Sequence, residues 1–201
     1  MSTNGLSLHL CSTDADRQEV VSLRDRRYHE RLGLRPSQWL DDEERDAAGW
    51  VFILRDSGRP AATVRVIPMG VASTELGNLG RLPEGCERDP HLCEVTRIAA
   101  EKRPSSELPY SAYLFGAAGA WLVETTDLRR YIGYCRTALL PFFSAVGARE
   151  IGDPFEIPGR GDTDYVLIGG HLTDVVDSVV GLGAKREDLP SLSEPVGGRQ
   201  R

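Results

Sequence analysis

A strand–turn–strand pattern in the first third of the chain places the strongest constraint on the fold. Residues 50–54 (Trp-Val-Phe-Ile-Leu) form a nearly continuous apolar run, which is typical of a buried strand. The turn signal Asp56-Ser57-Gly58 follows, and Ala61–Ile67 is a second apolar, β-branched run. The two runs predict an antiparallel hairpin at the centre of a sheet.

Apolar patterns on both sides of this hairpin predict a larger sheet with helices packed against it. Further strands are expected at 6–11, 92–99, 130–135, 148–151 and 165–168, and helices at 14–31, 110–126, 137–146 and 171–180. Residues 68–91 and 153–162 are rich in Gly and Pro and are expected to be loops. This order of elements predicts the α+β class, in an α/β/α-like arrangement.

Length and composition indicate one globular domain. Residues 1–181 of the 201 are expected to form it, and 182–201, rich in Gly, Pro, Ser and charge, to form a flexible C-terminal tail. The formal charge of -6 excludes a general electrostatic grip on nucleic acid, though not a local basic patch. No apolar run is long enough to span a bilayer and no secretory signal is recognisable, so we expect a cytoplasmic protein without a membrane partner.

The four cysteines are thinly spread and contain no C-x-x-C, so a disulfide scaffold is not expected. Cys86-x4-His91-x-Cys93 supplies three metal-ligating residue types, but in a spacing that is not a standard zinc motif. We therefore expect no metal site.

Three short motifs carry charged side chains, one on the first predicted helix and two on predicted strands. They are Arg24–Gly33 (Arg-Asp-Arg-Arg-Tyr-His-Glu-Arg-Leu-Gly), Ala62–Ile67 (Ala-Thr-Val-Arg-Val-Ile) and Glu94–Ala100 (Glu-Val-Thr-Arg-Ile-Ala-Ala). In this order, and followed by a helix–strand–helix–strand pattern, they resemble the GNAT acyltransferase superfamily over about residues 6–170. The branch they resemble is that of the autoinducer (acyl-homoserine lactone) synthases and the N-acyl amino acid synthases.

This resemblance implies the GNAT fold, with a central mixed, mostly antiparallel sheet, and an enzyme that transfers an acyl group to an amine. It implies no tightly bound cofactor, since the acyl donor is a co-substrate. The autoinducer synthases carry a Trp directly after Leu-Gly and a spaced acidic pair, which help bind adenosylmethionine. Here Leu34 follows Gly33, Trp39 comes five residues later, and the acidic residues form the run Asp41–Glu44. Lactone synthesis is therefore not expected.

The loop after the Glu94 strand is informative about the acyl donor. Typical CoA-dependent members have an Arg/Gln-x-x-Gly-x-Gly loop there, whose backbone amides hold a pyrophosphate. This chain has no glycine between Gly85 and Gly116. We therefore expect a donor on a macromolecule, an acyl carrier protein thioester before free acyl-CoA, with aminoacyl-tRNA as the alternative. The acceptor is expected to be the amine of an amino acid or similar small molecule.

Amide formation needs a base for the amine, donors for the oxyanion and a route for the leaving group. Glu94 is the candidate general base, directly or through water; the alternative is that it neutralises Arg97 or Arg65. The backbone N–H of Ile98 is the candidate oxyanion donor, if the strand has a bulge there. Tyr131, or its neighbour Tyr134, is the candidate acid for the leaving group.

Candidate substrate-binding residues lie on the same three motifs. Arg24 and Tyr28 share one helix face at i,i+4 and match the family pattern. Arg65 or Arg97 is expected to clamp the carboxylate of the acceptor, with a structural salt bridge as the equal alternative. Trp39 is a candidate for a pocket wall, although core packing is its more usual use.

Two questions stay open at this stage. The arginines of the first helix form either a docking patch for an acidic carrier or tRNA, or an ordinary solvated face. A non-catalytic GNAT-like binding module would also lack the pyrophosphate loop, so it remains an alternative to an enzyme. The oligomeric state is not predicted.

Overall fold

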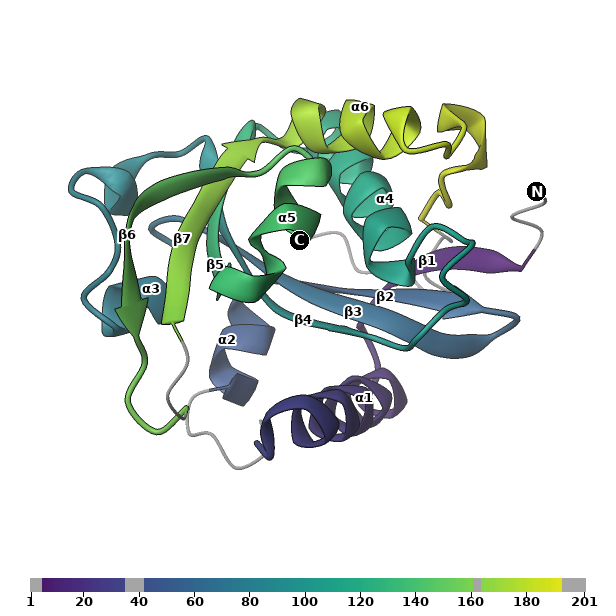
Figure 1. Cartoon of the computed structure of the whole chain (residues 1–201), viewed down its shortest axis with the longest axis horizontal. Coiled ribbons are helices and arrows are strands. Elements are labelled where there is room, and N and C mark those ends of the chain that lie inside the picture. The colour runs from purple at the N-terminus through teal and green to yellow at the C-terminus, as the bar shows by residue number, and fades with distance from the viewer. Residues whose placement is uncertain (1–4, 35–41, 161–163, 193–201) are drawn as a thin grey trace.

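A seven-stranded mixed sheet forms the centre of the protein in the computed structural model, which describes residues 5–34, 42–160 and 164–192 (Figure 1). The strands are β1 (Leu6–Leu10), β2 (Trp50–Asp56), β3 (Arg59–Pro68), β4 (Leu92–Ala100), β5 (Arg130–Arg136), β6 (Arg149–Glu156) and β7 (Asp164–His171). Their order in the sheet is β1-β2-β3-β4-β5-β7-β6, and only the β4–β5 pair is parallel. The predicted α+β class with a mixed, mostly antiparallel sheet is confirmed, as is the β2–β3 hairpin.

Helices cover both faces of the sheet. They are α1 (Asp14–Leu32), α2 (Asp42–Ala48), α3 (Glu75–Asn78), α4 (Tyr110–Thr125), α5 (Leu140–Ala145) and α6 (Leu172–Gly181), with short 3-10 turns at 86–88, 137–139 and 186–188. In Figure 1, α1 and α2 lie on one side of the sheet, and α4, α5 and α6 lie on the other. No helix in the described ranges is both long enough and apolar enough to cross a membrane.

The ends of α1 follow from local sequence chemistry. Thr13 caps its N-terminus in a capping box with Asp16, so each residue's side chain accepts a backbone N–H of the other. Gly33 ends the helix in a left-handed conformation with φ 68°. The predicted helix over 14–31 is confirmed, and it holds the charged motif 24–33 against β3 and β4.

Two segments differ from the sequence prediction. The loop predicted over 68–91 contains α3, whose four residues are too few to produce a helical period. β6 runs to Glu156, so it includes the start of the loop predicted over 153–162. A register shift between Ile151 and Phe155 breaks its alternation, which is why the sequence pattern stops early.

The segment after α6 packs against the rest of the domain. Gly116 of α4 permits this, because a Cβ there would lie 3.1 Å from both Leu189 and Val179 side chains. Leu192 forms a bridge to Leu8 of β1. Residues 182–192, which the sequence assigned to the tail, are thus in contact with the core, and 193–201 lie outside the described residues. The boundary at 181 stays a prediction, and these contacts favour a later one.

The sheet opens between β4 and β5. The two strands pair only from Leu92–Arg130 to Val95–Gly133, although they continue to Ala100 and Arg136. Gly133 allows the last pairing, since a Cβ there would lie 2.5 Å from the Val95 carbonyl oxygen. Beyond this point the strands diverge and leave a wedge-shaped gap in the sheet.

Candidate active site

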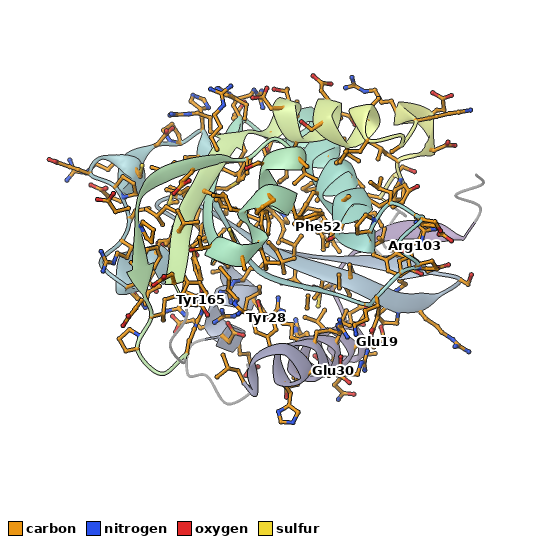
Figure 2. The ribbon with its side chains drawn as sticks, viewed as in Figure 1. Glu19, Tyr28, Glu30, Phe52, Arg103 and Tyr165 are labelled. Carbon is orange, nitrogen blue, oxygen red and sulfur yellow. The ribbon has the colours of Figure 1, made fainter. Side chains whose placement is uncertain are left out.

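A cavity of about 660 Å³ lies where the two strands diverge. Its walls include residues 96–100 of β4 and 134–136 of β5, together with Tyr28 of α1 and Tyr165 of β7, both labelled in Figure 2. A smaller, apolar cavity of about 50 Å³ lies behind it, between the sheet and helices α4 and α6. Ile98, Tyr134 and Phe143 line both cavities. The site therefore combines a wide mouth with a narrow apolar end.

β4 carries a bulge at the edge of this cavity. Arg65 of β3 faces Thr96, but Thr63 faces Ala99, so Arg97 and Ile98 together oppose one residue of β3. Arg97 has φ 56°, in the left-handed region that a non-glycine residue rarely adopts. An oxyanion role for the Ile98 N–H was expected only if β4 has a bulge at this point. The structure has this bulge, and it lies beside the cavity.

Asp42 of α2 holds two of the predicted arginines. One of its oxygens, Oδ1, accepts hydrogen bonds from Arg65 Nη1 at 2.7 Å and from Arg97 Nε at 2.8 Å. Asp46, one turn further along α2, binds Arg24 Nη1 at 2.6 Å. Burial raises the pKa of Asp42, but the charges of Arg97, Arg65 and Arg24 outweigh it and bring the pKa below its ordinary value. Asp42, from the acidic run, and Asp46, beyond its end, therefore form a spaced acidic pair on one face of α2.

Glu75 of α3 is a second centre of charge, and it is only 5% exposed. Arg97 Nη1 lies 2.9 Å from its Oε2, Arg65 Nη2 lies 3.5 Å from the same oxygen, and Arg160 forms a close ion pair with Oε1. The Tyr134 hydroxyl donates to Oε1 at 2.7 Å. Burial raises the pKa of Glu75, but Arg97, Arg160 and the Tyr134 hydrogen bond lower it to about 2. Glu75 is therefore a carboxylate at neutral pH.

Glu94 does not line the cavity. It is fully buried, and its two oxygens accept the backbone N–H groups of Glu75 at 2.9 Å and Leu76 at 2.7 Å. Burial raises its pKa, and these two hydrogen bonds oppose the rise. This geometry favours Glu94 as an acceptor of backbone N–H groups, because both of its oxygens have such partners and it does not line the cavity; its role as a base, directly or through water, stays a prediction. Of the two arginines in the alternative reading, Arg65 acts on Glu94 through its charge, which lowers the pKa of Glu94.

The arginines of α1 face inward more than the sequence suggested. Arg24 is 1% exposed and Arg27 is 5% exposed, so these two do not form a surface docking patch. Nε and Nη2 of Arg24, and Nη2 of Arg27, are buried and have no hydrogen-bond partner in the part of the chain that the structure describes. Arg27 lines the cavity. Buried N–H groups of this kind are costly unless something accepts them.

The two tyrosines of β5 lie in different environments. Tyr131 pairs with Cys93 below the opening of the sheet, lines only the smaller cavity and packs against Gly170. Tyr134 lines the larger cavity beside the bulge. Burial raises the pKa of both hydroxyls. Between the two, the geometry favours Tyr134 as the tyrosine that faces the substrates.

Two predicted substrate-binding positions remain, Tyr28 and Trp39. Tyr28 lines the cavity, whereas Arg24, one turn earlier on the same helix, does not. Leu34, in the place of the autoinducer synthases' Trp, also lines the cavity. Trp39 lies outside the described residues. Among the described residues no group of three His, Cys, Asp or Glu side chains is arranged to hold a metal ion.

Sequence reasoning missed Glu75 and Arg160 and did not single out Asp42 and Asp46. A signal for the acidic pair existed, since residues four apart share a helix face. For Glu75 the only signal was Thr74, which caps α3 by accepting the Gly77 N–H. Arg160 comes from the β6–β7 connection, and no periodicity places a loop residue beside α3.

The mouth of the cavity is basic although the protein as a whole is acidic. Glu101 is the only carboxylate among the described residues that line the cavity, whereas six basic residues line it: Arg27, Arg97, Lys102, Arg103, Arg136 and Arg160. The loop 101–109 is held by Arg103, which pairs with Glu107 at 2.7 Å and donates to the Leu108 carbonyl at 3.0 Å. This loop reaches α4 without a glycine and with Pro109 as the N-cap residue. The pyrophosphate cradle of CoA-dependent members therefore has no counterpart in its sequence.

Solved structures with a similar fold include acyl-homoserine lactone synthases and an N-acyl amino acid synthase. The CoA-dependent acyl-homoserine lactone synthase BjaI superposes with a TM-score of 0.72 at 14% identity, covering 95% of each chain. The acyl-homoserine lactone synthase LasI gives 0.69 at 14% identity, covering 88% of this chain and 95% of its own. FeeM, an N-acyl amino acid synthase from uncultured soil microbes, gives 0.65 at 15% identity, covering 84% and 91%. No curated protein sequence matches the chain.

The fold and the divided sheet place this protein in the class with the GNAT-like fold of the acyl-homoserine lactone synthases. Within that class the chain belongs to the N-acyl amino acid synthase FeeM family, which matches residues 19–170. The resemblance to the autoinducer and N-acyl amino acid synthase branch is thereby confirmed, and so is the prediction of an N-acyltransferase.

Proposed function

We propose that this protein joins an acyl group from a carrier-bound thioester to the amine of a small acceptor that bears a carboxylate, such as an amino acid. The observation that carries the proposal is a set of buried donors on two arginines: Arg24 Nε and Nη2 and Arg27 Nη2 have no acceptor among the described residues. The edge formed by Nε and Nη2 of Arg24 matches a carboxylate in two parallel hydrogen bonds, and Nη2 of Arg27 can donate one more. An acceptor carboxylate would satisfy these donors and place its amine in the cavity.

The proposed acyl donor follows from the basic mouth of the cavity and from the sequence of the loop 101–109. An acidic carrier protein complements the basic mouth, and a pantetheine arm entering between β4 and β5 needs no pyrophosphate cradle. Free acyl-CoA is the weaker candidate for this chain, although BjaI is CoA-dependent. The acyl chain would extend into the apolar cavity behind Ile98 and Phe143.

The chemistry needs few groups from the protein. The neutral amine attacks the thioester carbonyl, a C–N bond forms, and the Ile98 N–H donates to the oxyanion. The intermediate collapses with cleavage of the C–S bond. A thiolate is a good leaving group, so no strong acid is required. The amine proton passes to water in the cavity, since Glu94 is enclosed and Glu75 is ion-paired.

We propose a cytoplasmic location for this reaction. All four cysteines are free thiols, as is usual in a reducing compartment.

The test offers one acyl group on two carriers, acyl carrier protein and CoA, with each amino acid and the amine obtained by removing its carboxylate. We expect faster turnover from the carrier protein, and amides of the amino acids only. If the decarboxylated amines are used equally well, the proposal of a carboxylate-bearing acceptor is overturned. If CoA is the preferred donor, the proposal of a carrier-protein donor is overturned. A parallel reaction with aminoacyl-tRNA tests the alternative donor: an aminoacylated product there would overturn the carrier thioester, and no product in any of the reactions would point to the binding-module alternative.

Variants of Arg24 and Arg27 test where the carboxylate of the acceptor binds. Arg24→Gln and Arg27→Gln are expected to raise the KM for the acceptor at least tenfold, the loss of a hydrogen bond to a charged group. Arg17→Gln is the matched control, because Arg17 lies on the same helix but pairs at the surface with Asp14. An unchanged acceptor KM in both inward-facing variants overturns the assignment.

A further inference from the structure

Glu94 closes the start of α3. The first amides of a helix have no partner within it, and in α3 these belong to Glu75 and Leu76. Glu94 accepts both, one on each carboxylate oxygen. Thr74 Oγ1 accepts the next amide, that of Gly77, at 3.0 Å. A four-residue helix in a long loop is thus pinned to the centre of β4 by a buried carboxylate.

The side chain of Glu75 extends from this pinned helix to the wall of the cavity. It contacts three cavity-lining side chains, Arg97, Tyr134 and Arg160, but does not itself line the cavity. Its position depends on its backbone, which the Glu94 carboxylate holds.

Arg97 is the strained residue of the bulge. Its guanidinium is held at both ends, with Nη1 on Glu75 and Nε on Asp42. A non-glycine residue at φ 56° persists only when its surroundings enforce it. The peptide that follows carries the Ile98 N–H, so the direction of that N–H depends on how firmly the Arg97 side chain is held.

We propose that Glu94 and Glu75 form a positioning relay: Glu94 fixes α3, α3 fixes Glu75, and Glu75 holds Arg97 so that the Ile98 N–H faces the acyl carbonyl. The inference rests on the proposed acyl transfer at this site. Neither carboxylate touches substrate, and neither exchanges a proton with it. The two are positioning residues for an amide four residues beyond Glu94 on the same strand.

Kinetics of single and double variants test the relay. Glu75→Gln and Glu94→Gln are each expected to lower kcat about 10- to 100-fold, the usual cost of a misplaced reacting group, with little change in either KM. The double variant should be no slower than the slower single variant, since both act through one element. Glu19→Gln, which removes a surface partner of Arg55, is the control and should keep full activity.

The pH profile separates the relay from proton transfer. The pH–rate profiles of all variants should keep the shape of the wild-type profile, because the ionisation that limits the rate is that of the acceptor amine. Loss of an ionisation in Glu94→Gln, or multiplied losses in the double variant, would show that Glu94 acts as a base and would overturn the relay.

Hydrogen exchange provides a readout that does not depend on turnover. Glu94→Gln should accelerate amide exchange in α3 and also in the peptide spanning 95–100, although both side-chain contacts of Glu94 are with α3. Acceleration confined to α3 overturns the relay. Thr74→Val loosens the same helix with Glu94 intact, and should give a smaller effect in the same two segments even if Glu94→Gln fails to fold. If Glu94→Gln accelerates exchange in both segments but the wild-type protein shows no acyltransferase turnover, the proposed function is overturned and the relay stays in place.

Discussion

The Tyr134 hydroxyl donates its proton to Glu75 Oε1 at 2.7 Å and accepts a hydrogen bond from Arg160 Nη1 at 2.6 Å. Burial raises the pKa of this phenol, and the nearby Glu75 charge raises it further. Tyr134 therefore stays neutral at working pH with its proton directed at a carboxylate. In the cavity wall Tyr134 therefore connects α3, β5 and the β6–β7 connection, and it does not act as an acid.

Replacing this tyrosine should consequently have a limited effect. We predict that Tyr134→Phe lowers kcat by about tenfold or less, whereas loss of a general acid costs about 10²- to 10⁴-fold. Tyr131→Phe should keep wild-type kcat, because Tyr131 does not line the larger cavity. Initial rates at saturating substrate measure both. A loss above a hundredfold in Tyr134→Phe would assign it proton transfer to the leaving group.

Acid should weaken the protein through Glu75. Its folded-state pKa of about 2 lies below the ordinary 4.5, so its ion pairs contribute stability above pH 4.5 that is lost as the pH falls from 4.5 toward 2. At about 1.4 kcal/mol per pKa unit the contribution is about 3 kcal/mol. Urea unfolding between pH 7 and pH 3 should show a flatter dependence in Glu75→Gln than in wild type. Parallel curves for the two proteins would contradict this prediction.

Gly133 should tolerate no side chain. A Cβ there would lie 2.5 Å from the Val95 carbonyl oxygen, at the last pairing before the sheet opens. We predict that Gly133→Ala lowers the free energy of unfolding by about 2 kcal/mol or more, as overpacking does. Gly181→Ala is the control, since no atom lies within 4 Å of its added Cβ. Urea titrations measure both, and equal stability of the two variants would mean that β4 and β5 can separate without cost.

The sequence predicted the elements that have a strong period. The β2–β3 hairpin and α4 bury continuous or striped apolar residues, and such patterns do not depend on tertiary context. α3 is too short for any period, and the register shift in β6 interrupts its alternation. These were the segments that pattern reasoning could not resolve.

At the site, motifs located the charged residues but not their partners. Arg24, Arg65, Glu94 and Arg97 lie on regular elements, so their proximity follows from the fold. The choice between Glu94 as a base and Glu94 as a backbone acceptor depended on α3, which the sequence did not reveal. Glu75 comes from the short helix α3 and Arg160 from the β6–β7 connection, and only the folded chain brings them together.

Asp42 should be the most costly carboxylate to remove from α2. It accepts from Arg65 and Arg97, which are 0% and 4% exposed. We predict that Asp42→Asn destabilises the protein by about 3 to 5 kcal/mol, the cost of leaving buried charge uncompensated. Asp14→Asn removes an exposed partner of Arg17 and should have no measurable effect.

Salt should distinguish the enclosed ion pairs of Asp42 from the exposed ion pair of Asp14. The loss in Asp42→Asn should persist in urea titrations at 1 M NaCl, because screening by ions acts on exposed charges far more than on enclosed ones. Asp46 lies 3.4 Å from Arg65 Nη1 and is the nearest alternative acceptor. If Asp42→Asn is as stable as wild type, Asp46 has taken over this arginine, and the double variant Asp42→Asn, Asp46→Asn should then show the full loss.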